Sequence, residues 1–361
     1  MKKSYILAAS LLLLSAGTQV SYGQYILDKA NEQAAVYNYS VAKELYENAY
    51  AKKPTVDAAR GVAESYRHMK NYVWAESWYS KVVANKEHVP EDEYRYAEVL
   101  IANSKYSEAM NMLQQYKTKK PDDITAQKMY EGCALANERL QNPVKGSLSN
   151  MAAFNSKNSD WGLVQYKGKF IFSSDDSKDS IGHIPGYSTK NVRKNVYGWT
   201  GAGYLHLYES NGKDTIKTLL KDVNGDYHTA SPSFTADGKT MYYAVTSYVK
   251  KSRSFLGKEE PYTMNVQIKC REWDESKQAW GQEKDFPYNS GLNYSVGDPF
   301  ISADGNTLYF VSDKENGSGG TDIYYSQKDV SGKWGEPVNM GGEINTAGNE
   351  RTPFIDSDGF L

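Results

Sequence analysis

Pro299-Phe-Ile-Ser-Ala-Asp304-Gly305-Asn-Thr-Leu308-Tyr-Phe-Val-Ser312 is the stretch that decides the fold of the second half of this chain. Asp-Gly is a turn pair, because glycine takes positive φ at little cost, and the apolar and aromatic residues after it are typical of a strand. The same arrangement, a proline five residues before an Asp-Gly pair, recurs at Pro232–Gly238 and at Pro353–Gly359. The sequence therefore predicts a repeated β-hairpin, and such a repeat determines the architecture.

The hairpin belongs to a longer unit. Trp280-Gly281 and Trp334-Gly335 lie 54 residues apart, as do Pro299 and Pro353. That length holds four short strands with their loops, as in a β-propeller blade. A weaker copy, with Lys-Gly in place of Asp-Gly, begins at Asp160. We expect units to begin near residues 160, 230, 297 and 351, with long loops over 177–195 and 250–261.

Aspartate recurs at one place in the hairpin. This recurrence indicates turn geometry, because an aspartate side chain bonds its own backbone two residues further on. Paired catalytic acids or calcium ligands are the alternative interpretation of the same residues. The predicted turn residues are Asp237, Gly238, Asp304, Gly305, Asp358 and Gly359.

Residues 24–143 show a helical pattern that repeats every 33 to 34 residues, as the spacing of Tyr39, Tyr72 and Tyr106 shows. A small residue stands nine positions before each of these tyrosines, at Ala30, Ala63 and Ala97. Small side chains let two antiparallel helices approach closely, and proline ends such a pair. The second copy has its proline late, at Pro90, which predicts a longer connection there. A last helix is expected over about residues 122–140.

Stacked helix pairs offer a concave surface lined by the first helix of each pair. Counting from the small residues places three side chains of the second pair and two of the third on this surface. We predict that they bind a peptide or a partner protein, and the alternative is an ordinary solvated helix face. The five residues are Arg60, Glu64, Arg67, Tyr94 and Glu98.

The beginning of the chain has the pattern of a secretory signal peptide over residues 1–23: two lysines, an apolar run and a small-x-small cleavage site. Without Lys2 and Lys3 the 42 basic residues become 40 against 44 acidic residues, a net charge of −4 that gives no footprint for nucleic acid. Cys133 and Cys270 are expected to be small buried side chains without a disulfide.

Motifs for catalysis or metal binding are missing from the sequence. None of the five histidines belongs to a pair at metal-ligand spacing, and the glycine-rich stretch Asn316–Gly320 does not meet the G-x-S-x-G pattern. We therefore predict no catalytic residue, no metal and no cofactor.

Four stretches resemble the WD40-like (PD40) repeats of exported bacterial β-propellers: SPSFTADGKTMYY (231–243), DPFISADGNTLYFVSD (298–313), GGTDIY (319–324) and KWGEPVN (333–339). The signal peptide, tetratricopeptide-like helices and blades together resemble OmpA-type envelope proteins of Gram-negative bacteria that use type IX secretion. This resemblance implies a periplasmic protein associated with the outer membrane, whose partners are outer-membrane or secretion-apparatus components. It implies peptidoglycan binding only through an OmpA-like C-terminal domain, which this sequence does not contain.

The expected fold is α + β and multidomain: a signal peptide (1–23), a tetratricopeptide-like α-solenoid (24–143) and a WD40-like β-propeller that is incomplete in this chain (144–361). We predict a non-enzymatic scaffold that binds proteins through the helical groove and the propeller face and links an envelope assembly to the cell wall. The alternative is a carbohydrate-binding or glycan-active propeller, in which Trp161, Trp199 and Trp273 stack on sugars instead of packing between blades. A sensor propeller is a third class, which no residue singles out.

Overall fold

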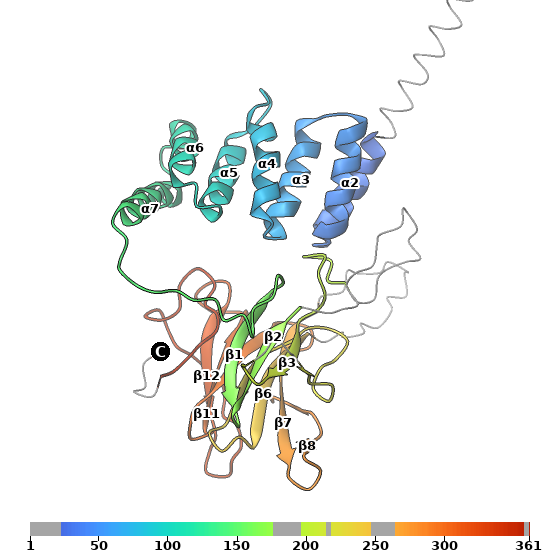
Figure 1. Ribbon diagram of the computed structural model, residues 1–361, viewed down its shortest axis with the longest axis vertical. Coiled ribbons are helices and arrows are strands. Elements are labelled where there is room, and N and C mark those ends of the chain that lie inside the picture. The colour runs from blue at the N-terminus through green and yellow to red at the C-terminus, as the bar shows by residue number, and fades with distance from the viewer. Residues whose placement is uncertain (1–22, 176–195, 214–217, 247–263, 357–360) are drawn as a thin grey trace, which may run out of the picture. The chain divides into compact units, whose positions relative to one another are not determined.

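The computed structural model describes residues 23–175, 196–213, 218–246, 264–356 and 361 (Figure 1). The predicted signal peptide, the predicted long loops over 177–195 and 250–261, and the turn at Asp358-Gly359 lie outside these residues. The chain divides into two compact units. The helical unit runs to Leu148 and also takes in Tyr197–Ala202, and the sheet unit holds the remaining residues from Ser149 onward.

The helical unit consists of seven helices in the described residues, which pack in sequence order as antiparallel pairs (Figure 1). Each of the three repeated tyrosines begins the second helix of a pair, so the predicted arrangement of tetratricopeptide-like pairs is confirmed. The helices cover residues 23–35, α2 (Tyr39–Lys52), α3 (Val56–His68), α4 (Tyr72–Val83), α5 (Pro90–Ala102), α6 (Tyr106–Lys119) and α7 (Ile124–Gln141).

Small residues hold the helices of each pair together. The alanines of the first helices, Ala30, Ala63 and Ala97, are fully buried, and they cluster with Ala42, Ala75 and Ala109 of the second helices. Successive pairs also approach closely at Gly61 of α3, where an added Cβ would lie 2.4 Å from the ring of Tyr46 in α2.

The helix starts follow local signals in the sequence. Thr55 caps α3 by accepting the Ala58 N–H at 3.2 Å, and Asp123 caps α7 by accepting the Ala126 N–H at 3.0 Å. Pro90 is the first residue of α5, where a backbone N–H has no acceptor within the helix. Proline, which lacks this N–H, therefore loses no hydrogen bond there. The late proline thus begins a helix, and residues 84–89 form the longer connection that its position predicted.

The sheet unit contains three successive antiparallel sheets in which neighbouring strands follow one another along the chain. The first sheet is β1 (Asp160–Tyr166), β2 (Lys169–Ser174), β3 (His206–Ser210) and β4 (Thr218–Leu219). The second is β5 (Thr229–Phe234), β6 (Thr240–Thr246), β7 (Val266–Asp274) and β8 (Ala279–Trp280), with β9 (Lys284–Asp285) also paired to β7. The third is β10 (Val296–Ile301), β11 (Thr307–Ser312), β12 (Asp322–Gln327) and β13 (Val338–Asn339). The first three predicted unit starts are therefore confirmed.

The hairpin turns have the backbone geometry that their Asp-Gly pairs predict. Gly238 and Gly305 take φ of +64° and +73°, in the region that glycine adopts without strain. Asp237 accepts the backbone N–H of Lys239 at 2.9 Å, and Asp304 accepts that of Asn306 at 3.0 Å. The Thr235 hydroxyl, which donates to Asp237, is the main cause that lowers the pKa of that carboxyl.

Alternate residues of the central strands build two apolar layers between the sheets. Ile171 and Leu207 of the first sheet cluster with Met241 and Tyr243 of the second. The layer between the second and third sheets is lined by Tyr242, Ile268, Leu308 and Phe310. Since successive side chains of a strand point to opposite faces, the second sheet contributes one face to each layer.

Candidate partner-binding surface of the helical unit

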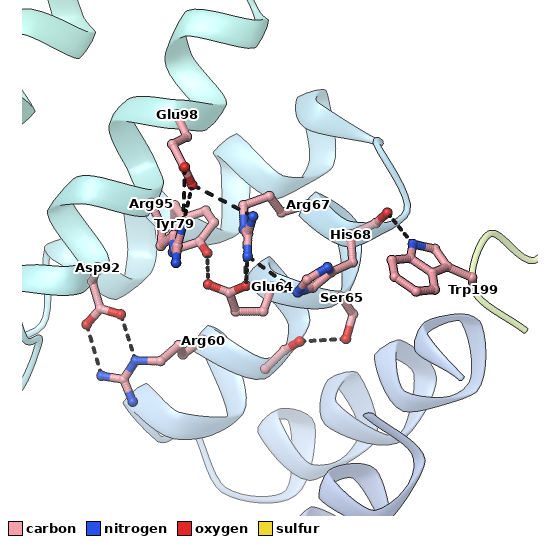
Figure 2. Close-up of polar contacts among 11 residues, drawn as sticks. Arg60, Glu64, Ser65, Arg67, His68, Tyr79, Asp92, Arg95, Glu98 and Trp199 are labelled. Atoms are coloured by element: carbon pink, nitrogen blue, oxygen red, sulfur yellow. Dashed lines mark hydrogen bonds and ion pairs between the residues drawn. The ribbon is translucent and has the colours of Figure 1, made fainter. Parts of the chain in front are cut away.

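The predicted inner face of the helical unit carries two groups of paired polar and charged side chains, one around Arg60 and one around Glu64 (Figure 2). They come from α3 and α5, the first helices of two successive pairs, and from α4 between them. We call this set the inner-face network. Its members are Arg60, Glu64, Arg67, Tyr79, Asp92, Arg95 and Glu98.

Arg60 and Asp92 form a bidentate ion pair between α3 and α5. The guanidinium Nε lies 2.7 Å from Oδ1 and Nη2 lies 2.9 Å from Oδ2. The Asp92 side chain is buried, and its Oδ2 also accepts the Val89 N–H at 2.9 Å at the start of α5. The hydrogen bond to Asp92 is the main cause that raises the pKa of Arg60. The guanidinium is thus fixed in one orientation.

Glu64 is the centre of the rest of the network. Its Oε2 accepts Arg67 Nη2 at 2.6 Å, and its Oε1 accepts the hydroxyl of Tyr79. Arg67 also forms an ion pair with Glu98, with Nη1 3.7 Å from Oε2, and Arg95 Nη1 donates to the same oxygen at 2.9 Å. Burial raises the pKa of Tyr79, and the charge of Glu64 raises it further, so the phenol stays a neutral donor. Charges of both signs therefore alternate along the surface.

The structure brings four of the five predicted groove residues into the network and leaves Tyr94 outside it. The Tyr94 ring packs against Tyr116 of α6 at 5.2 Å between centroids, and the Arg95 guanidinium lies 5.4 Å from the Tyr94 centroid. Tyr94 therefore flanks the charged set as an aromatic surface.

The sequence prediction missed three members of the network: Tyr79, Asp92 and Arg95. Arg95 stands three residues before Glu98, a spacing that places both side chains on one helix face. Asp92 stands two residues after Pro90, in a first helical turn that favours acidic side chains. Tyr79 comes from the second helix of its pair, and no spacing signal connects it with Glu64.

An aromatic cluster at His68 lies next to this surface. The indole Nε1 of Trp199 donates to the His68 carbonyl at 2.9 Å (Figure 2). The Trp199 ring also stacks on Tyr37, with centroids 5.4 Å apart. Gly198 accepts the Ser40 N–H at 3.0 Å, which anchors the segment Tyr197–Ala202 to α2. Burial and the neighbouring Arg67 lower the pKa of His68.

The three tryptophans considered for stacking on sugars occupy separate environments. Trp199 packs within the helical unit, Trp161 lies in β1, and Trp273 in β7 packs edge-on against Trp280 with centroids 5.3 Å apart. Within the sheet unit, Trp161 and Trp273 thus belong to two different sheets.

Three further properties concern metal binding, membrane-spanning helices and the two cysteines. Among the described residues, no three histidine, cysteine, aspartate or glutamate side chains are grouped to hold a metal ion. None of the described helices has the length and apolar composition needed to cross a membrane. Cys133 is buried and Cys270 half-buried, both as free thiols, and burial raises the pKa of each.

Comparison with known proteins locates similar folds for parts of the chain. No protein-family model and no curated protein matches the sequence. A tetratricopeptide-containing domain of a Plasmodium falciparum FK506-binding protein is 16% identical over 35% of this chain and 95% of its own, with a TM-score of 0.33. The first tetratricopeptide domain of human RPAP3 is 19% identical over 34% of this chain and 97% of its own, with a TM-score of 0.31. Trypanosoma rangeli sialidase is 12% identical over 49% of this chain and 30% of its own, with a TM-score of 0.27.

Proposed function

We propose that this chain is a non-enzymatic scaffold that binds protein partners through the inner face of its helical unit. The observation that carries the proposal is the inner-face network, whose charged side chains are held in place by one another. Groups that are already ordered lose little conformational freedom when a partner binds, so more of the interaction energy appears as affinity. Stacked helix pairs supply such a surface along several repeats.

Arg95 has the most exposed side chain of the network members, and Glu98 lies beside it. Their side chains are 43% and 30% exposed, and Arg95 uses only Nη1 for its bonds to Glu98. A guanidinium has five N–H donors, so the remaining ones can bind a carbonyl or a carboxylate of the partner. Tyr94 adds an amphipathic ring beside them, of a kind enriched at interfaces.

We further propose that the three sheets are blades of a WD40-like β-propeller that offers a second binding face. Three consecutive antiparallel sheets, each with a four-strand meander and the second with β9 added, support this architecture, as do the recurring Asp-Gly hairpins of the second and third. A further copy of the repeat begins at Pro353. The residue before this proline, Thr352, has φ of +51°. The residues before Pro232 and Pro299, which are Ser231 and Asp298, have similar φ values of +53° and +46°.

The location proposed for the protein is the periplasm, in association with the outer membrane. The support is the signal-peptide pattern of residues 1–23 and the resemblance of the blade motifs to OmpA-type envelope proteins of type IX-secreting bacteria. Its partners would then be outer-membrane or secretion-apparatus components. A link to the cell wall would require a peptidoglycan-binding domain elsewhere in the protein.

Site-directed photo-crosslinking in cells tests partner binding at the inner face. A benzophenone amino acid replaces Tyr94 on the inner face or, as a matched control, the exposed Ser77 on α4 of the preceding pair. We expect protein adducts from position 94 and few from position 77. Equal labelling at both positions, or none at position 94, contradicts the proposal. Binding of a polysaccharide without any protein adduct would favour the glycan-binding alternative.

Cell fractionation tests the location. The proposal predicts a processed protein that begins at Gln24 and is recovered with the outer membrane. Recovery of an unprocessed chain in the cytoplasm would contradict it.

A further inference from the structure

The dipeptide Asn-Gly recurs in the sheet unit. In such a pair the backbone nitrogen of the glycine can attack the side-chain carbonyl carbon of the asparagine, because glycine has no side chain to obstruct the approach. The attack requires that the amide turns toward the glycine nitrogen and that this nitrogen loses its proton to water. The hydrogen bonds of each pair therefore decide whether the reaction occurs. The three pairs are Asn211-Gly212, Asn224-Gly225 and Asn316-Gly317.

The pair Asn224-Gly225 is held at both reacting groups. The Asn224 Oδ1 accepts the Leu207 N–H at 2.7 Å, and its Nδ2 donates to the carbonyls of Leu207 and Leu220 at 2.9 and 3.0 Å. The Gly225 N–H donates to the Thr229 hydroxyl at 3.3 Å. The amide cannot turn toward Gly225 without breaking its hydrogen bonds, so the fold protects this pair.

The pair Asn211-Gly212 is held in part. Asn211 is exposed, and its Oδ1 accepts the Lys213 N–H at 2.9 Å. The Gly212 N–H donates to the Ser210 hydroxyl at 3.1 Å. Gly212 also lies against Phe170, whose ring would be 2.8 Å from an added Cβ. The attacking nitrogen of this pair is therefore engaged, although its amide is exposed to water.

The pair Asn316-Gly317 lacks both restraints. It lies in the loop between β11 and β12, in which residues 313–320 are all exposed. Among the residues that the structure describes, no hydrogen bond engages the Asn316 amide or the Gly317 N–H. The reaction that the fold hinders at Asn224 is thus open here.

The loop that carries this pair passes over a buried carboxylate. Asp322, the first residue of β12, is 1% exposed, and its Oδ2 accepts the Ser318 N–H at 2.5 Å and the Asn339 amide at 2.9 Å. An added Cβ at Gly317 would lie 2.3 Å from the same oxygen. The Asp322 Oδ1 is buried and has no hydrogen-bond partner among the described residues. A change of charge or chain length at residue 316 therefore acts close to one of the few bonds that hold Asp322.

We propose that Asn316-Gly317 is a site of spontaneous deamidation, which adds a carboxylate near the Ser318–Asp322 bond and loosens the start of β12. The Gly317 nitrogen forms a bond to the side-chain carbonyl carbon of Asn316, the amide C–N bond breaks, and ammonia leaves with the proton of the glycine nitrogen. Water then opens the cyclic imide at either of its C–N bonds, which gives aspartate or isoaspartate. Isoaspartate also lengthens the main chain by one carbon atom just before Gly317.

Peptide mapping of the aged protein tests the site. Tryptic peptides 195–213, 222–239 and 315–328 each contain one Asn-Gly pair, and the exchange of an amide for a carboxyl group is read from their masses. In the folded protein we expect peptide 315–328 to be modified at least about tenfold faster than 222–239, because reaction at Asn224 first requires the loss of its hydrogen bonds. Peptide 195–213 should also react more slowly than 315–328.

The matched control is the same protein aged in urea, where the three peptides should react at similar rates because no pair is held by the fold. Equal rates for 222–239 and 315–328 in the folded protein would overturn the inference. Modification of 315–328 in urea alone would overturn it as well.

Substitutions test the effect on β12. Asn316→Asp introduces the carboxylate at once, so hydrogen exchange at the Ser318 N–H, measured by nuclear magnetic resonance, should become several-fold faster than in the unsubstituted protein. Asn316→Gln keeps a neutral amide and should leave this exchange unchanged. Asn211→Asp places the same charge after β3 in the first sheet and should leave it unchanged too. Unchanged exchange in Asn316→Asp would overturn the effect on β12. None of these measurements involves the inner face of the helical unit, so they are independent of the partner proposed above.

Discussion

Replacing Asp92 with asparagine should lower the free energy of unfolding of the helical unit by about 2–3 kcal/mol. Asp92 is buried and holds Arg60 through two bonds of 2.7 and 2.9 Å. Breaking a buried ion pair by removing one charge costs about 3–5 kcal/mol. The lower value applies because the asparagine oxygen still accepts one N–H and because the Arg60 side chain, 27% exposed, keeps Asp57 and some water.

Asp57→Asn is the matched control because it removes a carboxylate from the same guanidinium. Asp57 Oδ1 lies 2.6 Å from Arg60 Nη1, a distance as short as those to Asp92, but its side chain is 68% exposed. Exposed ion pairs contribute about 0.2–1 kcal/mol and are screened by salt. The control substitution should therefore lower the free energy of unfolding by less than about 1 kcal/mol, and by less still at high ionic strength.

Urea unfolding followed by far-ultraviolet circular dichroism measures both effects on the helical signal. With a slope of about 1–3 kcal/mol per molar urea, the Asp92 variant should move the midpoint down by about 0.7–3 M. Equal shifts for the two variants would refute the reasoning that burial decides the strength of these pairs. A shift that vanished in high salt for the Asp92 variant would do so as well.

Three further predictions concern other parts of the fold. Gly61→Ala should destabilise by about 1–3 kcal/mol, since its Cβ would lie 2.4 Å from the Tyr46 ring. Gly132 lies on the exposed side of α7, and an added Cβ would meet no atom within 4 Å. Gly132→Ala should therefore raise the free energy of unfolding by about 0.8–1 kcal/mol in the same urea assay. Burial lowers the pKa of His228 to about 4, and its neutral Nδ1 accepts the Leu205 N–H at 3.0 Å. Because the unfolded chain takes up this proton first, the sheet unit should lose up to about 3 kcal/mol as pH falls from about 6.5 to 4. His228→Asn keeps an acceptor and should remove that part of the pH dependence in unfolding measured across this range, and an unchanged slope would contradict the assignment.

The sequence predicted the elements better than the contacts between them. The 33- to 34-residue period located the helix pairs because buried alanines must recur wherever two helices touch. The Asp-Gly hairpins located the starts of the sheets, since a turn with positive φ leaves a strong local signal. Counting along α3 and α5 placed Arg60, Glu64, Arg67 and Glu98 on one predicted surface, and their role in binding stays a prediction.

The asparagines that bond both backbone groups of one residue in the third strand of each sheet were beyond such counting. Asn224, Asn289 and Asn345 are 65 and then 56 residues apart, because loops of different length separate them. No fixed period reveals them, although each bonds the same place in its sheet. The contacts of Trp199 with the helices could not be predicted for a similar reason, because its segment joins the helical unit from a distant position in the chain.

The sequence by itself thus determined the two kinds of repeat, their starts and their turns, because the spacing of side chains along a helix or strand is a local property. The tertiary structure decided that Arg60 meets Asp92, that Tyr79 meets Glu64 and that Asn345 bonds the backbone of Ile323. These pairings depend on the distance and angle at which separate elements pack, and neither quantity is written in the order of residues along one element.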